Sequence, residues 1–381
     1  MGDAFLCSYF SLYFIDRGIP ANEQAILLAL IPFSMFLGCL LFSSLARTSN
    51  RALWIYRFCL LAEVGLTIGF AFCDSFLSLV ILTPIIGLVN SAPFSLIEGY
   101  IVPRLEEKGG NYAFVRVFGA IGYAISLLAG AVLLRYITIR ECFYLSSGFF
   151  VGALALSFLL QEKRAQEEAL VEKKYEVVPS SKRFHLSRGA VIFCLSAALI
   201  YGSFSGCSYL FPVRLNQLGF LDADYSLARG IGVVVETAFY LLVPLMGKLF
   251  RNKRIPLYAC GVLFILSTLS GVIMTEPWSL AFVFFTLGSI AKAFLFSYEA
   301  TVLRGIVGEK ELSRVLTMSM GLINLNSAIL NLFSTTLFEM WGYQGYFGLI
   351  SGMELLGVGL LFALPRNGKG DAEASSLSNE S

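Results

Sequence analysis

Long apolar runs recur along this chain, separated by short polar segments. A run of about 20 apolar residues is the length that an α-helix needs to cross the roughly 30 Å hydrocarbon layer of a bilayer. Because that layer offers no water to bond free backbone groups, such runs fold as helices. Runs of this kind start near Gln24, Ala52, Phe76, Asn111, Cys142, Ala190, Ser226, Ile255, Pro277, Val315 and Gly342. The sequence therefore predicts an all-α membrane protein.

The first residues, Met1 to Phe14, form a shorter apolar segment with a single charge at Asp3. The segment is too short to cross a bilayer, and it lacks the basic start of a signal peptide. We interpret it as the outer half of a twelfth helix whose beginning is missing, because the start codon is misassigned or the chain is a truncated form.

Composition supports the membrane class and excludes several others. The chain is 57% hydrophobic and 14% charged, whereas a soluble domain is about 25% charged. The net charge of +2 is too small to indicate nucleic-acid binding. The cysteines occur singly and His185 is the only histidine, so we expect no metal site. No P-loop, GxSxG or HExxH pattern occurs, and we expect neither an enzyme nor an ATP-driven pump, and no cofactor.

A linker dense in both charges divides the helices into two groups of six. It contains the Pro179-Ser180-Ser181 break, and the chain ends in a Gly, Ser, Asp and Glu-rich tail that we expect to be disordered. The predicted parts are an N-terminal half at 1–160, a linker at 161–188, a C-terminal half at 189–365 and a tail at 366–381.

A weak internal repeat indicates that the two halves are homologous. Leu96 to Asn111 is similar to Ser297 to Ser313, which places Glu98 opposite Glu299. Two six-helix halves related in this way bind a solute between them near the bilayer midplane.

Orientation follows from the distribution of basic residues, which concentrate in cytoplasmic loops. Most of the 28 lysines and arginines lie in the linker and in the loops on its side of the membrane. We therefore expect a multi-pass protein of the plasma (cytoplasmic) membrane, the inner membrane where a cell has two, with linker and C-terminus in the cytoplasm. The opposite side receives Arg17, Arg135, Arg140, Arg214 and Arg229.

Ionisable side chains inside apolar runs cost roughly 2.5 to 3.5 kcal/mol each on insertion scales, which makes them candidates for function. Such residues are Asp3, Arg57, Glu63, Glu98, Arg116, Glu236, Lys292, Glu299 and Glu354.

Glu98 and Arg116 flank a loop centred near residue 107, each nine residues from that centre. In an antiparallel helical hairpin they lie at similar depth, where they can pair and bind a solute hydroxyl. The alternative is that Glu98, five residues before Pro103, only marks the cytoplasmic end of its helix. Tyr123 lies on the Arg116 face at i+7 and offers a ring for a sugar or base. Its alternative role is ordinary packing around glycines.

The second half carries its own polar candidates. Lys292 and Glu299 are seven residues apart on one helix and hence roughly 10 Å apart on one face. Glu236 lies ten residues into its apolar run, and Asn324 begins a polar stripe on the eleventh span. We expect Glu236 and Lys292 to line a polar cavity. The alternative is a structural ion pair within this half.

The run Asn111 to Gly130, NYAFVRVFGAIGYAISLLAG, resembles the fifth helix of the lactose permease group of sugar/proton symporters, a branch of the major facilitator superfamily. The resemblance implies that Glu98 and Arg116 bind sugar and that Tyr123, where that group has tryptophan, stacks against it. It weakens in the second half, because Gly288 and Ala291 stand where that group has its proton-coupling histidine and glutamate.

Together these features predict a major facilitator fold and a secondary active transporter, working by alternating access. We expect a small polar solute, such as an oligosaccharide or nucleoside, with proton coupling and a monomer in the bilayer. Alternatives are an exporter of drugs or metabolites and a non-transporting membrane sensor or assembly partner. The predicted substrate-binding residues are Glu98, Arg116, Tyr123 and Asn324. The predicted coupling residues are Glu236, Lys292, Glu299 and Asp3.

Overall fold

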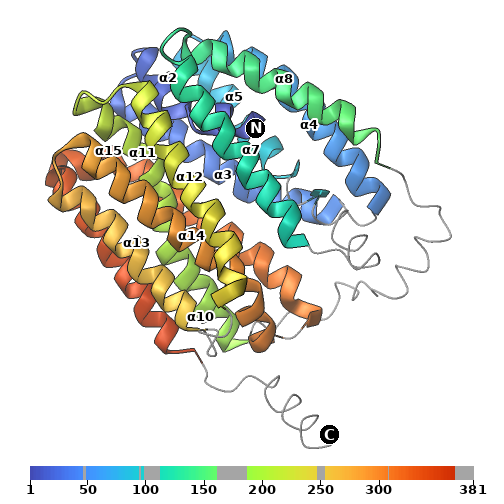
Figure 1. Cartoon of the computed structure of the whole chain (residues 1–381), viewed down its shortest axis with the longest axis vertical. Helices are drawn as coiled ribbons and strands as arrows, with labels where there is room; N and C mark the ends of the chain where they lie inside the picture. The colour runs from blue at the N-terminus through green and yellow to red at the C-terminus, as the bar shows by residue number, and fades with distance from the viewer. Residues whose placement is uncertain are drawn as a thin grey trace, which may run out of the picture.

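Helices make up all the regular structure of the described residues, as Figure 1 shows. The computed structural model describes residues 1–45, 49–93, 96–97, 112–160, 187–246, 254–307 and 309–364. The first half contains α1 (Gly2–Cys7), α2 (Phe10–Asp16), α3 (Ala21–Leu45), α4 (Ser49–Ala71), α5 (Phe76–Asn90), α7 (Tyr112–Leu133) and α8 (Ile139–Ser157). The second contains α10 (Arg188–Ala197), the π-helical turn η1 (Ala198–Gly202), α11 (Ser203–Gln217), α12 (Asp222–Leu245), α13 (Ile255–Ile273), α14 (Pro277–Val307) and α15 (Glu309–Phe362).

The predicted all-α class is confirmed, and the predicted spans agree with these helices. The helices expected at Phe76, Ile255 and Pro277 begin at those residues. The last two spans are continuous in α15 except at Gly342, whose φ of 65° and ψ of −177° interrupt the helix. This positive φ is accessible to glycine at little cost, so the break occurs where the sequence predicts a new span. Short helices α1 and α2 follow each other end to end and represent the first helix.

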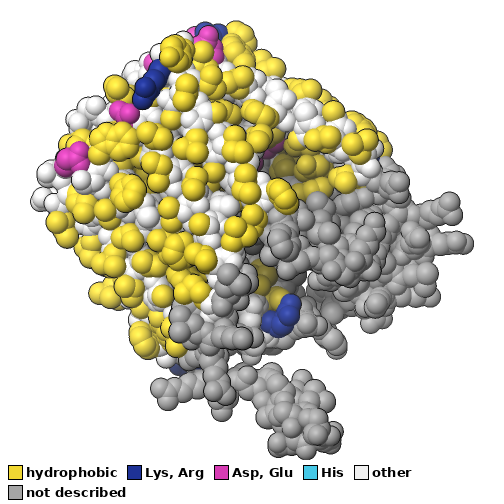
Figure 2. All heavy atoms as spheres, viewed as in Figure 1, with side chains coloured by type: hydrophobic (Ala, Val, Ile, Leu, Met, Phe, Trp, Pro, Cys, Tyr) yellow, Lys and Arg dark blue, Asp and Glu magenta, His cyan; other side chains and the backbone are white. Residues whose placement is uncertain are grey.

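The outer surface is apolar enough for lipid contact. Eight helices, counted over the described residues, are long and apolar enough to cross a membrane. Large hydrophobic side chains point outward, among them Phe58 and Phe118, which are 67% and 72% exposed. Figure 2 shows hydrophobic side chains over most of the described part of the visible face, with charged groups mainly at its upper left edge. Apolar surface of this extent marks a membrane-facing protein.

The two halves contact each other along α3 and the first part of α15. The Asn331 side chain donates to the Leu28 carbonyl at 3.2 Å, and Thr335 donates to the Ala21 carbonyl at 3.2 Å. These bonds connect the beginning of α3 with the later turns of the part of α15 before Gly342. Both segments lie at the end of the molecule opposite the end of α8 and the start of α10.

A second contact joins α7 to α12 at the same end, and the two helices run side by side in Figure 1. Ser226 Oγ donates to the Leu127 carbonyl at 2.7 Å and also bonds to the Tyr9 hydroxyl. Gly130 allows this approach, because a Cβ there would lie 2.2 Å from Tyr9 Oη and 2.9 Å from Ser226 Oγ. Small residues let membrane helices pack this closely. These contacts between the halves therefore close the end away from the end of α8 and the start of α10, which we call the outer end.

Two arginines cap helix ends at equivalent places in the two halves. Arg57 of α4 donates to the carbonyls of Ser157 at 3.1 Å and Leu160 at 3.3 Å, at the end of α8. Arg254, directly before α13, donates to the Leu364 carbonyl at 3.2 Å, beyond the end of α15. A cation bonded to terminal carbonyls stabilises a helix C-terminus. The repeated arrangement supports the internal repeat that the sequence indicates.

We expect Arg57→Met to lower the stability of the folded protein without changing its helix content. Arg57 is 7% exposed, and its hydrogen bonds to the two carbonyls are worth about 1.5–3 kcal/mol each because the donor is charged. Thermal unfolding in detergent, followed by tryptophan fluorescence, should show a lower midpoint than wild type. Arg51→Met, on the same helix, serves as the comparison variant. An unchanged midpoint for Arg57→Met would show that the cap contributes nothing.

Candidate functional site

Arg229 occupies the centre of a hydrogen-bond network that crosses from one half to the other. Its Nη1 donates to Tyr225 Oη at 2.7 Å, and its Nη2 donates to Tyr123 Oη at 3.3 Å. Tyr123 Oη lies 2.9 Å from Ser8 Oγ on the first helix. Arg229 belongs to the C-terminal half, whereas Tyr123 and Ser8 belong to the N-terminal half. The network therefore depends on how the halves are placed relative to each other.

The expectation that Arg229 lies in an outer loop is wrong. The eighth span begins at Asp222, because Asp222 and Asp224 supply acids that favour a helix N-terminus. Sequence analysis starts this span near Ser226, where the apolar run begins. Because the helix starts four residues earlier, Arg229 lies seven residues after its first residue instead of three, at a depth where its charge needs partners.

Tyr123 is half-buried, and its hydroxyl is bonded to groups on two other helices. Tyr123 packs against the buried core, whereas a Cβ at the neighbouring Gly119 would meet no atom within 4 Å. Close helix packing therefore does not explain this glycine. That Tyr123 binds solute remains a prediction.

Glu236 and Lys292 are brought together within the C-terminal half. Lys292 Nζ on α14 lies 3.7 Å from Glu236 Oε2 on α12, and the side chains are 27% and 15% exposed. Lys292 Nζ also lies 6.0 Å from the centre of the Phe204 ring on α11. Glu236 is seven residues after Arg229 and hence on the same face of α12. The pair is thus partly accessible and lies on the face that carries Arg229.

Variants that remove the charges can distinguish the two possible roles of this pair, which are lining a cavity and supporting the structure. Lys292→Met leaves Glu236 without its partner, and we expect the folded protein to lose stability because an unpaired charge is enclosed. The double variant Glu236→Gln/Lys292→Met removes both charges, and we expect it to regain most of that stability. If the pair also lines the transport path, the double variant remains inactive in uptake. Unfolding midpoints and uptake rates measured on the same preparations distinguish the two roles, and full activity of the double variant would leave only structural support.

The other predicted residues are spread over different environments. Glu299 is 4% exposed and accepts a hydrogen bond from Ser319 Oγ at 3.1 Å, between α14 and α15. Asn324 is half-buried on α15 and has no hydrogen-bond partner among the described side chains. Asp3 lies on α1 and accepts a hydrogen bond from Asn90 of α5 at 2.7 Å. These hydrogen bonds of Glu299 and Asp3 go to residues outside the Glu236–Lys292 pair.

Glu98 lies outside the described residues, and so does the side chain of Arg116, whose backbone lies near the start of α7. The predicted pairing of Glu98 with Arg116 stays a prediction. In the described part of the chain, no group of three His, Cys, Asp or Glu side chains is placed to hold a metal ion.

Sequence reasoning also missed the π-helical turn η1 in the seventh span. The side-chain amide of Asn326 donates to the Ala198 carbonyl at 2.9 Å and to Ser203 Oγ at 3.1 Å. Single π turns of this kind are frequent at functional sites. Tyr201, on this turn, is close enough to Arg229 and Glu236 to interact electrostatically with both. The only signal in the sequence is Asn326 within an apolar run, and it does not name its partner.

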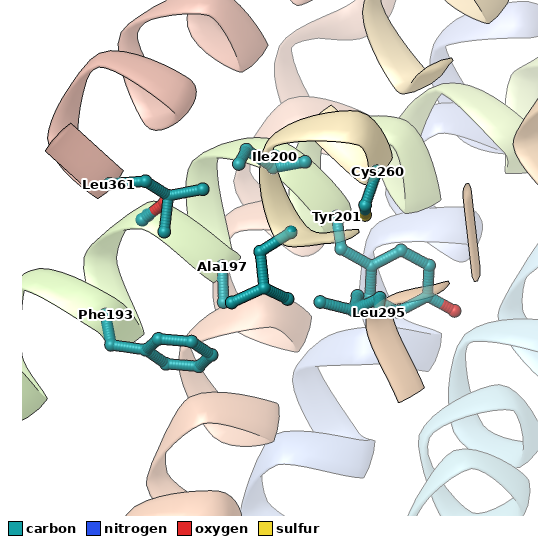
Figure 3. A pocket seen from close by; sticks show the side chains of 9 residues that line it. Phe193, Ala197, Ile200, Tyr201, Cys260, Leu295 and Leu361 are labelled. Atoms are coloured by element: carbon teal, nitrogen blue, oxygen red, sulfur yellow. The ribbon is translucent and has the colours of Figure 1, made fainter. Parts of the chain in front are cut away.

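An apolar pocket adjoins this turn inside the C-terminal half, as Figure 3 shows. Ser196 is its polar lining residue besides Tyr201, and the Ser196 hydroxyl already donates to the Gly357 carbonyl at 2.7 Å. The other lining residues are apolar, so we do not assign the polar solute to this pocket. Its lining residues are Phe193, Ser196, Ala197, Ile200, Tyr201, Leu257, Cys260, Leu295 and Leu361.

Comparison with known proteins identifies the family. The model of the MFS_1-like family matches residues 4–344, nearly the whole chain. The chain belongs to this family. This MFS_1-like protein is thus a multi-pass membrane protein of the major facilitator superfamily and not an enzyme.

The proteins of named function that resemble this chain are distant in sequence. The maltose permease of Geobacillus stearothermophilus is 25% identical over 151 residues, which cover 39% of this chain and 37% of the permease. The match therefore spans well under half of that relative. The nucleoside transporter NupG superposes with a TM-score of 0.72 at 13% identity, over 95% of this chain and 94% of its own. The human organic anion transporter MFSD10 gives 0.59 at 15% identity over 92% of this chain and 88% of its own. These structures confirm the predicted major facilitator fold.

Proposed function

We propose that this MFS_1-like protein is a secondary transporter that moves a small polar solute by alternating access between its two halves. The observation that carries the proposal is the Arg229–Tyr123 bond across the halves. An arginine enclosed at this depth is costly unless it serves a polar ligand or partner. A bond between the halves must break when the halves separate at the outer end, so this site can respond to their movement.

An uncharged solute rich in hydroxyl groups fits the site best. Arg229 and Lys292 supply donors and Glu236 supplies an acceptor, so that the site can both donate to and accept from hydroxyl groups. Tyr123 and Tyr201 add ring faces on which a sugar or base can lie. The names of the maltose permease and of the nucleoside transporter NupG both denote solutes of this chemistry. We place the protein in the plasma membrane, with the linker in the cytoplasm. The outer end, where the two halves are in contact, then faces the outside of the cell.

The exporter alternative has its own supporting observation, which is the superposition on the human organic anion transporter MFSD10. This superposition supports the exporter only weakly. The two sequences are 15% identical, and proteins that share a fold at such identity transport unrelated solutes. The cluster of both charge signs does not favour an anion in particular.

The test is uptake by proteoliposomes that contain the purified protein. Labelled oligosaccharides and nucleosides are supplied with and without an inward proton gradient, and protein-free vesicles measure leakage. We expect one class to enter in a saturable way, and to accumulate when the gradient is present. If none enters although the protein is folded and inserted, efflux assays with dyes and organic anions decide for the exporter. Failure of both would reject transport.

A further inference from the structure

Two carboxylates from different helices meet at one amide in the N-terminal half, away from the Glu236–Lys292 pair. The Asn90 side-chain nitrogen on α5 donates to Asp3 Oδ1 at 2.7 Å and to Glu63 Oε1 on α4 at 3.1 Å. An amide nitrogen carries two hydrogens, so both are used. Cys7, one turn after Asp3, donates to Asn90 Oδ1 at 3.8 Å. We call Asp3, Glu63 and Asn90 the carboxylate triad.

Glu63 is not satisfied by these bonds. Its side chain is 2% exposed, and its second oxygen, Oε2, is buried with no hydrogen-bond partner. A buried carboxylate without a full set of partners is costly, and a second carboxylate on the same amide adds repulsion. Both costs fall when the pair holds one proton, as in other carboxylate pairs that share a site. Asp3, by contrast, is exposed, which gives the pair access to solvent.

We propose that the carboxylate triad binds the proton that drives transport, which deepens the proposed function and rests on it for the coupling. A proton enters from water at Asp3, is held between Asp3 and Glu63, and leaves to water on the other side of the membrane. One proton is taken up and one released, with no other reactant. A metal cation suits the triad less, because Asn90 presents its nitrogen, and not its oxygen, to both carboxylates.

The surroundings of the triad connect it to the contact between the halves. Ser8 follows Cys7 and bonds to Tyr123, which accepts from Arg229. The charge of Arg229 reaches Cys7 at the edge of the triad. When the outer end opens, the Arg229–Tyr123 bond breaks and the chain Arg229–Tyr123–Ser8 that ends beside Cys7 is interrupted, so the surroundings of the triad change with the position of the halves. The ionisable groups facing the triad are the Met1 amine and Cys7 on α1, Tyr56 and Cys59 on α4, Tyr123 on α7 and Arg229 on α12.

Glu354 provides a matched control. It is 0% exposed, it accepts a hydrogen bond from Thr268 Oγ1 at 2.6 Å, and its Oε1 is buried without a partner. Its neighbours Thr268 and Ser351 are also buried, at 0% and 6% exposed, and neither is a carboxylate. Glu354 therefore resembles Glu63 in burial and bonding, but lacks both the second acid and the path to water.

The first experiment requires no solute. Infrared difference spectra of the purified full-length protein between acidic and alkaline buffer detect the carbonyl band of a protonated carboxyl group. We expect a titrating band that disappears in Glu63→Gln and Asp3→Asn and persists in Glu354→Gln. If the band persists in both triad variants, the triad is not the proton site. If added sodium shifts the band at constant pH in wild type but not in Glu63→Gln, the site binds a cation, and the proton proposal is overturned.

The second experiment uses proteoliposomes and the solute found in the uptake panel. With a gradient of about one pH unit, one coupled proton gives about tenfold accumulation. Glu63→Gln should reduce that ratio to about one, while exchange of labelled for unlabelled solute continues. Accumulation by Glu63→Gln as in wild type would overturn the coupling. If wild type moves no solute at all, the proposed function fails, and the infrared result still decides whether the triad binds a proton.

Discussion

Arg229→Gln should reduce solute uptake by about 100-fold or more. The arginine makes two hydrogen bonds to tyrosine hydroxyls, at 2.7 Å and 3.3 Å, and its fork suits two vicinal hydroxyls of a sugar or ribose. Hydrogen bonds to charged groups contribute about 1.5–3 kcal/mol each, and about 2.7 kcal/mol corresponds to 100-fold. Arg229→Lys should recover little, because an ammonium group cannot bond two oxygens in the planar geometry of a guanidinium. Initial uptake rates in proteoliposomes measure both variants.

Arg214→Gln is the control for the loss of an arginine. Arg214 lies in the last turn of α11, with its guanidinium carbon 4.3 Å from the centre of the Tyr343 ring, at the outer end. We expect its uptake to stay within about twofold of wild type, because this half-buried cation–π contact, worth about 0.5–2 kcal/mol, involves Tyr343 and no residue of the Arg229 network. If the Arg229→Gln variant is folded and takes up solute at the wild-type rate, Arg229 is not part of the solute site.

Membrane thickness explains why the sequence predicts the fold so well. A helix must supply about 20 apolar residues to cross the bilayer, and the polar breaks between runs show where each helix ends. The break at Gly342 was therefore predictable even though α15 continues through it. The boundary at Asp222 was not, because acidic residues at a helix start look like loop residues in a hydropathy profile.

The candidate site was predictable only in part. Glu236 and Lys292 stand out because each is a charge inside an apolar run, and two such charges in one half tend to pair. Their 3.7 Å separation depends on how α12 and α14 are rotated about their axes. A hydropathy profile does not show how a helix is rotated about its axis. For the same reason, the sequence could not show that Asn90 bonds to both Asp3 and Glu63. Asn90, at the end of α5, is uncharged and gave no signal at all.

Gly130→Val should prevent closure of the outer end and reduce transport at least about tenfold. A Cβ at Gly130 would lie 2.2 Å from Tyr9 Oη and 2.9 Å from Ser226 Oγ. Tyr9 is 0% exposed, so its ring has no free space into which to withdraw, and overpacking of this kind is costly. The contact with Tyr9 lies within the N-terminal half, but the contact with Ser226 is relieved when α7 and α12 separate, which shifts the population toward the state open at the outer end. A protein that is held in one of its two states cannot complete the transport cycle.

Spin labels placed at the outer end measure this shift directly. Tyr136→Cys and Leu221→Cys lie on turns of the two halves and are 82% and 67% exposed, so labels there react readily and disturb little. The distance between the labels should increase in Gly130→Val relative to the labelled parent. Gly148→Val is the control, because a Cβ at Gly148 meets no atom within 4 Å, and it should leave both distance and uptake unchanged. An unchanged distance in Gly130→Val together with lost uptake would locate the effect in solute binding instead, since the halves would then still close over the added side chain.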